Sequence, residues 1–203
     1  MTGINPKTTK TKFTIKTHTD RIQLMILTGV FAAFTAACSI ISFPLPFTPA
    51  PLNLALLAVF MAGVILGPRY GPLSQVVFIL MGAIGIPVFA NFRAGVGVLI
   101  GPTGGYLAGY VVAAMVIGLI SHRYYNKGIK QTLVFGLAML LGMLACYVLG
   151  TAWLMYLTKT PLIPALIIYA APFIPGDLIK LAAAVFLSGR LDNYNVRIQW
   201  CDL

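Results

Sequence analysis

Long apolar runs dominate the chain, and they restrict its possible folds more than any other feature. Six runs can be traced, separated by short segments rich in Pro, Gly or charged residues. They cover approximately residues 22–43, 53–67, 71–89, 104–121, 131–157 and 164–188. A helix of about 20 apolar residues is long enough to cross the hydrocarbon core of a bilayer. The pattern therefore predicts an all-α membrane protein, a bundle of six transmembrane helices.

The composition supports this prediction and excludes other classes. Hydrophobic residues make up 59% of the chain, whereas Lys, Arg, Asp and Glu make up only 9%, against about 25% in soluble domains. A water-soluble globule of 203 residues needs a charged surface that this chain cannot supply. A soluble enzyme, a disordered tail and a secreted disulfide scaffold are therefore excluded, and we expect a multi-pass protein of the lipid bilayer.

The same runs divide the chain into three parts. We predict a basic N-terminal segment at 1–21, a transmembrane domain at 22–190 and a polar tail at 191–203. The first run, 22–43, is too long for the apolar region of a signal peptide, and no small-x-small cleavage site closes it. We therefore interpret it as an uncleaved first span.

The basic residues predict the orientation of the chain. With six spans both termini lie on one side, and that side holds eleven of the 14 Lys and Arg residues. The opposite side holds only Arg93 and Lys159, while Lys180 lies within the sixth run. Cytoplasmic segments carry an excess of Lys and Arg, so both termini are predicted to be cytoplasmic. The net charge of +10 then reflects orientation in the membrane, and we expect no nucleic-acid partner.

The outward-facing connections on this topology are the complicated ones. Segments 44–51, 91–105 and 158–176 are outside and contain much of the Pro and Gly, whereas the inner connections are short and basic. Binding residues concentrate on loops that a rigid frame holds in place. We therefore expect the ligand to bind on the outer side.

Asp177 and Lys180 are the strongest candidates for a binding site. Asp177 is the only acidic residue between Asp20 and Asp192, and the i, i+3 spacing puts Asp177 and Lys180 on one helix face. One interpretation is a helix cap neutralised by an ion pair. The other is a pair that faces a ligand cavity, which we favour because charges within membrane spans are costly and usually mark function.

Two further polar residues, Asn91 and Arg93, lie in the outer loop among glycines. Arg93 can hold an anionic or amide-bearing ligand, or it can extend to the lipid headgroups. Both interpretations remain open for Asn91 as well. The glycine-rich segment 101–106 nearby lacks the Lys and Ser or Thr of a phosphate-binding P-loop. Its glycines are better explained by a sharp turn or a close approach to a ligand or a neighbouring helix.

Alanines four residues apart mark the first run, where Ala32 pairs with Ala36 and Ala33 with Ala37. Small residues at this spacing form a flat strip on which another helix packs closely. Packing inside the protein and docking of a partner protein both fit this strip.

Catalytic groups are scarce. The chain has two His and four acidic residues, without an HExxH or GxSxG motif, and Cys38, Cys146 and Cys201 are isolated from one another. We therefore expect no catalytic residues, no metal site and no cofactor. A substrate-binding membrane protein is the class that remains.

Three blocks carry a family resemblance: GIPVFA at 85–90, GPTGGYL at 101–107 and PGDLIK at 175–180. They resemble the BioY family, the biotin-specific S components of energy-coupling factor transporters, over essentially residues 22–190. The resemblance implies six helices in a bacterial plasma membrane and capture of biotin from outside. It also implies a partner module with a transmembrane T subunit and two cytoplasmic ATPases, which would supply the energy.

The resemblance also implies residue roles. Asp177 and Lys180 are expected to contact the bicyclic head of biotin, where Asp177 can accept from an N–H and Lys180 can donate to the C=O. Aromatic side chains are expected to pack on the fused rings, the candidates being Phe43, Phe47, Phe89, Tyr106, Tyr169 and Phe173.

Other implications concern partners. The alanine strip is expected to dock the T subunit, through Ala33 and Ala37 or through Ala32 and Ala36.

After PVFA this chain reads Asn91-Phe92-Arg93, where many family members carry a Gly-rich stretch. Asn91 or Arg93 is expected to meet the carboxylate or close the loop. The alternative function is an S component for another vitamin, such as thiamin or riboflavin. When the chain is alone, a homo-oligomer is a further possible partner state.

Overall fold

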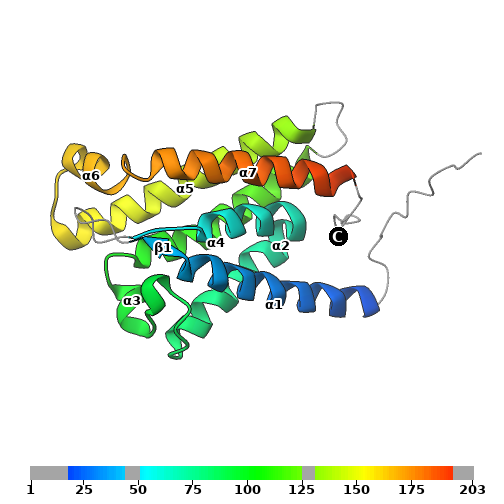
Figure 1. Cartoon of the computed structure of the whole chain (residues 1–203), viewed down its shortest axis with the longest axis horizontal. Helices are drawn as coiled ribbons and strands as arrows, with labels where there is room; N and C mark the ends of the chain where they lie inside the picture. The colour runs from blue at the N-terminus through cyan, green and yellow to red at the C-terminus, as the bar shows by residue number, and fades with distance from the viewer. Residues whose placement is uncertain (1–17, 44–50, 125–130, 194–203) are drawn as a thin grey trace, which may run out of the picture.

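The computed structural model describes residues 18–43, 51–124 and 131–193, and its long elements are all helices (Figure 1). The helices are α1 (His18–Ile40), α2 (Ala55–Ala83), α3 (Val96–Ile100), α4 (Gly104–Arg123), α5 (Gln131–Thr158), α6 (Leu162–Tyr169) and α7 (Ile174–Asn193). A 3-10 turn, η1 (Ala90–Phe92), and an antiparallel pair of two-residue strands, β1 (Ser42–Phe43) and β2 (Leu52–Asn53), accompany them. Most of the predicted N-terminal segment and tail, together with Phe47 and Cys201, lies outside the described residues.

The prediction of an all-α membrane protein is confirmed. Among the described residues, α1, α2, α4 and α5 are each long and apolar enough to cross a membrane. Together, α6 and α7 are long and apolar enough to form one further span, with a bend of 57° between them. Many of their large apolar side chains are exposed, as expected for surfaces that face lipid. Counted by length, these helices are fewer than the six predicted, because α2 takes in most of both run 53–67 and run 71–89.

A sharp reversal divides α2 into two helical segments. Gly67 has φ 75° and ψ −168°, which lies outside helical geometry and in a region that favours glycine. A Cβ on Gly71 would lie only 3.1 Å from the carbonyl oxygen of Ala62. In a continuous helix these residues would be about 13 Å apart along the axis, so the chain folds back on itself at Gly67. Pro68, which has no N–H to satisfy, begins the second segment.

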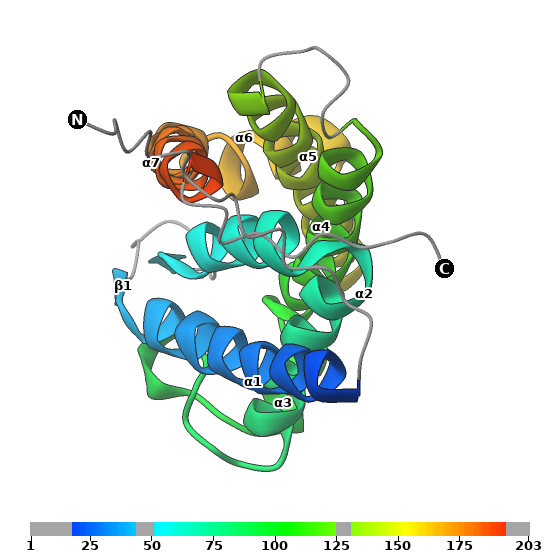
Figure 2. The ribbon, with the colours of Figure 1, turned by 90° about the vertical axis from the view of Figure 1, so that its right-hand side faces the viewer.

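Glycines bring α2, α4 and α5 into close contact. Ile117 of α4 is fully buried, and a Cβ on Gly63 of α2 would lie 2.8 Å from its Cβ. A Cβ on Gly142 of α5 would lie 2.5 Å from its Cγ1. Bilayer helices associate chiefly through such close packing, since lipid is as apolar as the side chains. Figure 2 shows the resulting bundle, with α2 in the middle, α1 on one side, and α5 and α7 on the other.

The alanine strip of α1 has two different faces. Ala32 and Ala36 are buried and belong to the hydrophobic core shared with α2. Ala33 and Ala37 are exposed. The two interpretations of the strip therefore apply to different pairs, since only Ala33 and Ala37 offer a surface to another molecule.

The bundle has two distinct ends. Figure 1 shows that α1 begins, α4 ends, α5 begins and α7 ends at one end, whereas the β1–β2 pair, α3 and α6 lie at the other. The reversal at Gly67 lies at the first end, because a Cβ on Gly118, near the end of α4, would lie 2.6 Å from the carbonyl carbon of Gly67. The loop-rich second end is where the candidate site is found.

We predict that Gly118→Ala destabilises the protein by roughly 1–3 kcal/mol, because the added methyl group meets the backbone at Gly67 and the helices must separate. Gly29→Ala on α1 is the matched control, since a Cβ there meets no atom within 4 Å and alanine favours a helix. Thermal unfolding of the purified protein in detergent measures both. Equal melting temperatures for the two variants would contradict close packing at Gly118.

Candidate ligand-binding site

A cavity of about 300 Å³ opens at the loop-rich end of the bundle. Its walls come from α1, β2, α2, η1, α3, α4, α5 and α7, so segments far apart in the sequence meet there. The volume is at the lower limit of the range, about 300–1,000 Å³, that small-molecule sites occupy. The six residues predicted to bind substrate all line it, namely Phe89, Asn91, Arg93, Tyr106, Asp177 and Lys180. Their role in binding stays a prediction.

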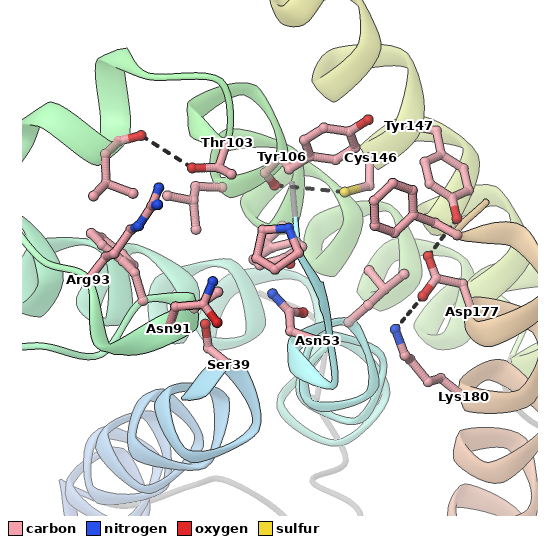
Figure 3. Close-up of a pocket in the computed structure, with 18 residues that line it drawn as sticks. Ser39, Asn53, Asn91, Arg93, Thr103, Tyr106, Cys146, Tyr147, Asp177 and Lys180 are labelled. Atoms are coloured by element: carbon pink, nitrogen blue, oxygen red, sulfur yellow. Dashed lines mark hydrogen bonds and ion pairs between the residues drawn. The ribbon is translucent and has the colours of Figure 1, made fainter. Parts of the chain in front are cut away.

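A buried ion pair occupies one side of the cavity. Asp177 lies in the first turn of α7 and is only 5% exposed, and Lys180, one turn later, is 7% exposed. The Lys180 Nζ donates to Asp177 Oδ1 at 2.5 Å, and the Tyr147 hydroxyl of α5 donates to Asp177 Oδ2 at 2.5 Å. Figure 3 shows these three side chains together at one end of the site. The pair is thus both an ion pair and a part of the cavity wall, so the two interpretations of its sequence spacing are not exclusive.

Asn91 and Arg93 lie at the opposite end of the cavity (Figure 3). Ser42 fixes Asn91 from the β1 strand: the Asn91 backbone N–H donates to Ser42 Oγ at 2.9 Å, and the Ser42 hydroxyl lies 2.9 Å from Asn91 Oδ1. With its oxygen directed to Ser42, the Asn91 amide keeps its NH₂ group for a ligand. Arg93 is exposed. It takes part in no ion pair with the acidic residues of the described chain.

Two aromatic residues, Phe89 and Tyr106, form apolar parts of the cavity wall. Phe89 is 2% exposed and packs edge-to-face on Phe78 with a centroid distance of 5.6 Å. Gly82 makes room for its ring, because a Cβ there would lie 2.0 Å from Phe89 Cζ. Tyr106 of α4 donates its hydroxyl hydrogen to the Tyr169 carbonyl at 2.7 Å. Both rings are therefore fixed before a ligand arrives.

The GPTGG segment packs against its neighbours. A Cβ on Gly104 would lie 1.7 Å from the Leu99 carbonyl oxygen, and one on Gly105 would lie 2.3 Å from Trp153 Cβ. The Trp153 indole N–H donates to the Gly101 carbonyl at 2.9 Å. These glycines are required for close approach of α3 and α5 to the start of α4, which is one of the two roles predicted for them.

Several polar lining residues were not predicted from the sequence: Ser39, Asn53, Thr103, Tyr110, Cys146 and Tyr147. Apart from the adjacent pair Cys146 and Tyr147, each stands alone within an apolar run or a loop, and no motif spacing marks them. Conversely, Phe43 is 65% exposed, and neither it nor Tyr169 lines the cavity. The ligand contacts predicted for these two rings therefore stay a prediction.

Comparison with known proteins identifies the family. The BioY family profile matches residues 8–195 of this chain. The chain belongs to the BioY family. A "Biotin transporter BioY" of Thermotoga maritima is 37% identical over 86% of this chain and 99% of its own length. The protein of the same name from Lactococcus lactis is 30% identical over 86% of this chain and 93% of its own.

A solved structure agrees with the family assignment. It is described as the S-component for biotin from an ECF-type ABC transporter. The match has a TM-score of 0.81 at 28% identity and covers 88% of this chain and 95% of the other. BioY proteins are named as transporters. The chain is accordingly a membrane transport protein and not an enzyme, as its few acidic and basic catalytic groups predict.

Proposed function

We propose that this protein is the substrate-binding S component of a vitamin importer, and that it captures biotin on the outer side of a bacterial plasma membrane. The observation that carries this proposal is the charge difference between the two ends of the cavity. The end with Asp177 and Lys180 is internally balanced, because one carboxylate pairs with one ammonium. The end with Arg93 has a surplus positive charge among the described residues.

Biotin matches this charge pattern. Its ureido ring is neutral and offers two N–H donors and a C=O acceptor, and its valeric acid chain ends in a carboxylate. Asp177 can accept from an N–H while the remaining Lys180 hydrogens donate to the C=O. Arg93 and the Asn91 amide then meet the carboxylate. Phe89, Tyr106 and Phe173, which line the cavity, supply the apolar contacts for the rings and chain.

The same pattern disfavours the two alternative vitamins. Thiamin is a cation, and a site with a surplus positive charge repels it. Riboflavin has no anionic group to satisfy Arg93. An S component for either vitamin remains the alternative that binding experiments must exclude.

For the topology we propose six spans with both termini in the cytoplasm. The two segments of α2 count as separate spans because the chain reverses at Gly67, and α6 with α7 counts as one bent span. The basic residues of the described chain support the orientation: Arg21, Arg69, Arg123 and Arg190 belong to the end where α1 begins, whereas Arg93 and Lys159 belong to the cavity end. By the positive-inside rule the cavity faces outward.

Energy for transport must come from partners in this proposal, since the sequence has no ATP-binding P-loop. We propose a transmembrane T subunit and two cytoplasmic ATPases. The exposed residues Ala33 and Ala37 of α1 are the surface proposed to dock the T subunit, while the buried Ala32 and Ala36 hold α1 to the core. Biotin binds outside, the protein docks, and ATP hydrolysis in the partners tips it within the membrane. A homo-oligomer of the isolated chain can use the same surface.

We predict that Asp177→Asn weakens biotin binding at least about tenfold, because a charge-assisted hydrogen bond is lost and Lys180 is left unpaired. Isothermal titration of the purified protein in detergent measures the affinity, with size-exclusion chromatography to verify folding. In the unmodified protein we expect biotin to bind and neither thiamin nor riboflavin to compete with it. Unchanged affinity in the variant would remove Asp177 from the site.

Arg93→Gln should weaken binding of biotin by about tenfold but leave binding of uncharged biotin methyl ester within about twofold, since only biotin carries the anion that Arg93 contacts. Lys159→Gln is the matched control, because Lys159 is an exposed cation that does not line the cavity. An equal loss for both ligands would contradict the placement of the carboxylate at Arg93.

Replacement of Ala33 or Ala37 by Leu should spare biotin binding but abolish co-purification with the T subunit, because the larger side chain prevents close helix contact. The control is Ala152→Leu on α5, at an exposed alanine outside the strip. Co-expression of the tagged protein with the T subunit and ATPases gives the readout. Intact complexes with both α1 variants would reject the docking role.

A further inference from the structure

Tyr147 lines the cavity and contacts Asp177, although the sequence did not predict a role for it. We propose that it is a positioning residue, whose hydroxyl group holds the Asp177 carboxylate in the orientation that reads the polar head of the ligand. This inference rests on the proposed function, since it assigns the ligand head to the Asp177 end. It concerns a different helix, α5, from the one that carries Asp177 and Lys180.

The geometry gives Asp177 two attachments of different origin. Lys180 holds Oδ1 from within α7, one turn away, and Tyr147 holds Oδ2 from α5. One hydrogen bond leaves a carboxylate free to rotate about its Cβ–Cγ bond, whose torsion has a broad energy minimum. Two hydrogen bonds from separate helices fix the plane of the group. A carboxylate that is only 5% exposed also needs such partners, because an unsatisfied buried charge is costly.

The direction of the hydrogen bonds determines what remains for a ligand. The ionised carboxylate only accepts, so Tyr147 must donate its single hydroxyl hydrogen to Oδ2. Each carboxylate oxygen can accept two hydrogen bonds, so both oxygens keep capacity toward the cavity. The ammonium of Lys180 retains two of its three hydrogens. The fixed group thus presents an acceptor beside a donor, the complement of an N–H beside a C=O in a cyclic urea.

Rigidity is the expected benefit of this arrangement. A site that is ordered before the ligand arrives avoids the cost of ordering side chains during binding. Tyr147 packs its ring against the hydrophobic core, where Met143 and Cys146 of the same helix are buried. Removal of the hydroxyl alone should therefore leave the ring in place and release the carboxylate.

Tyr147→Phe tests the proposal, with Tyr156→Phe as the control because Tyr156 is an exposed tyrosine of the same helix. Isothermal titration of the full chain in detergent should show that Tyr147→Phe binds biotin about tenfold more weakly, while Tyr156→Phe binds as the unmodified protein does. Biotin methyl ester should lose the same factor, because the change lies at the head end. In a protein that already carries Asp177→Asn, Tyr147→Phe should weaken biotin binding by no more than about a further twofold, because the carboxylate that Tyr147 holds is already absent.

The outcomes separate this proposal from the proposed function. Absence of biotin binding to the unmodified protein rejects the proposed function, and the positioning role with it. If the Tyr147→Phe variant binds biotin as tightly as the unmodified protein while the Asp177→Asn variant binds it more weakly, only the positioning role is rejected. A full tenfold additional loss in the Asp177→Asn background shows that Tyr147 acts independently of Asp177 and overturns the proposal. The proposal is also overturned if Tyr147→Phe weakens binding of biotin but not of biotin methyl ester. This comparison does not require the Asp177 variant to fold.

Discussion

Close contact of α4 with α2 and α5 is the constraint on which the rest of the structure depends. In a bilayer the helices gain nothing by hiding apolar surface from lipid, so they must gain by touching closely. Glycines make this possible along the whole of α4: Gly109 faces Cys146, Gly105 faces Trp153, and Gly118 faces the reversal at Gly67. The cavity residues of α4 and α5 therefore stand on one rigid wall, and the loops and α7 complete the site around it.

The two ends of the cavity differ in net charge. One end holds a carboxylate and an ammonium that neutralise each other, and the other end holds Arg93 without an acidic partner among the described residues. A binding site achieves specificity by leaving unfavourable partners unsatisfied as well as by contacting the correct one. An elongated ligand with a neutral polar head and an anionic tail satisfies both ends, whereas a cationic ligand leaves the charge of Arg93 uncompensated.

Much of this site was accessible from the sequence because polar residues are conspicuous in an apolar chain. Asp177, Lys180, Asn91 and Arg93 were identified by their cost or position, and all four line the cavity. Tyr147 was not identified, since tyrosine is common in apolar runs and its partner is 30 residues away. Phe43 was a candidate because its residue type suits a cavity wall, but it does not line the cavity, and its position depends on the strand pair that carries it.

The sequence by itself determined the class of the protein, the positions of the apolar runs and the residues whose charges need an explanation, because hydropathy and charge are local properties. Only the tertiary structure decided which faces and partners these residues have. Ala32 and Ala36 are buried whereas Ala33 and Ala37 are exposed, although their spacing is identical. The Asp177 carboxylate has a second donor from α5. Both facts depend on how one helix is rotated against another, and that rotation is set by contacts between residues distant in the sequence.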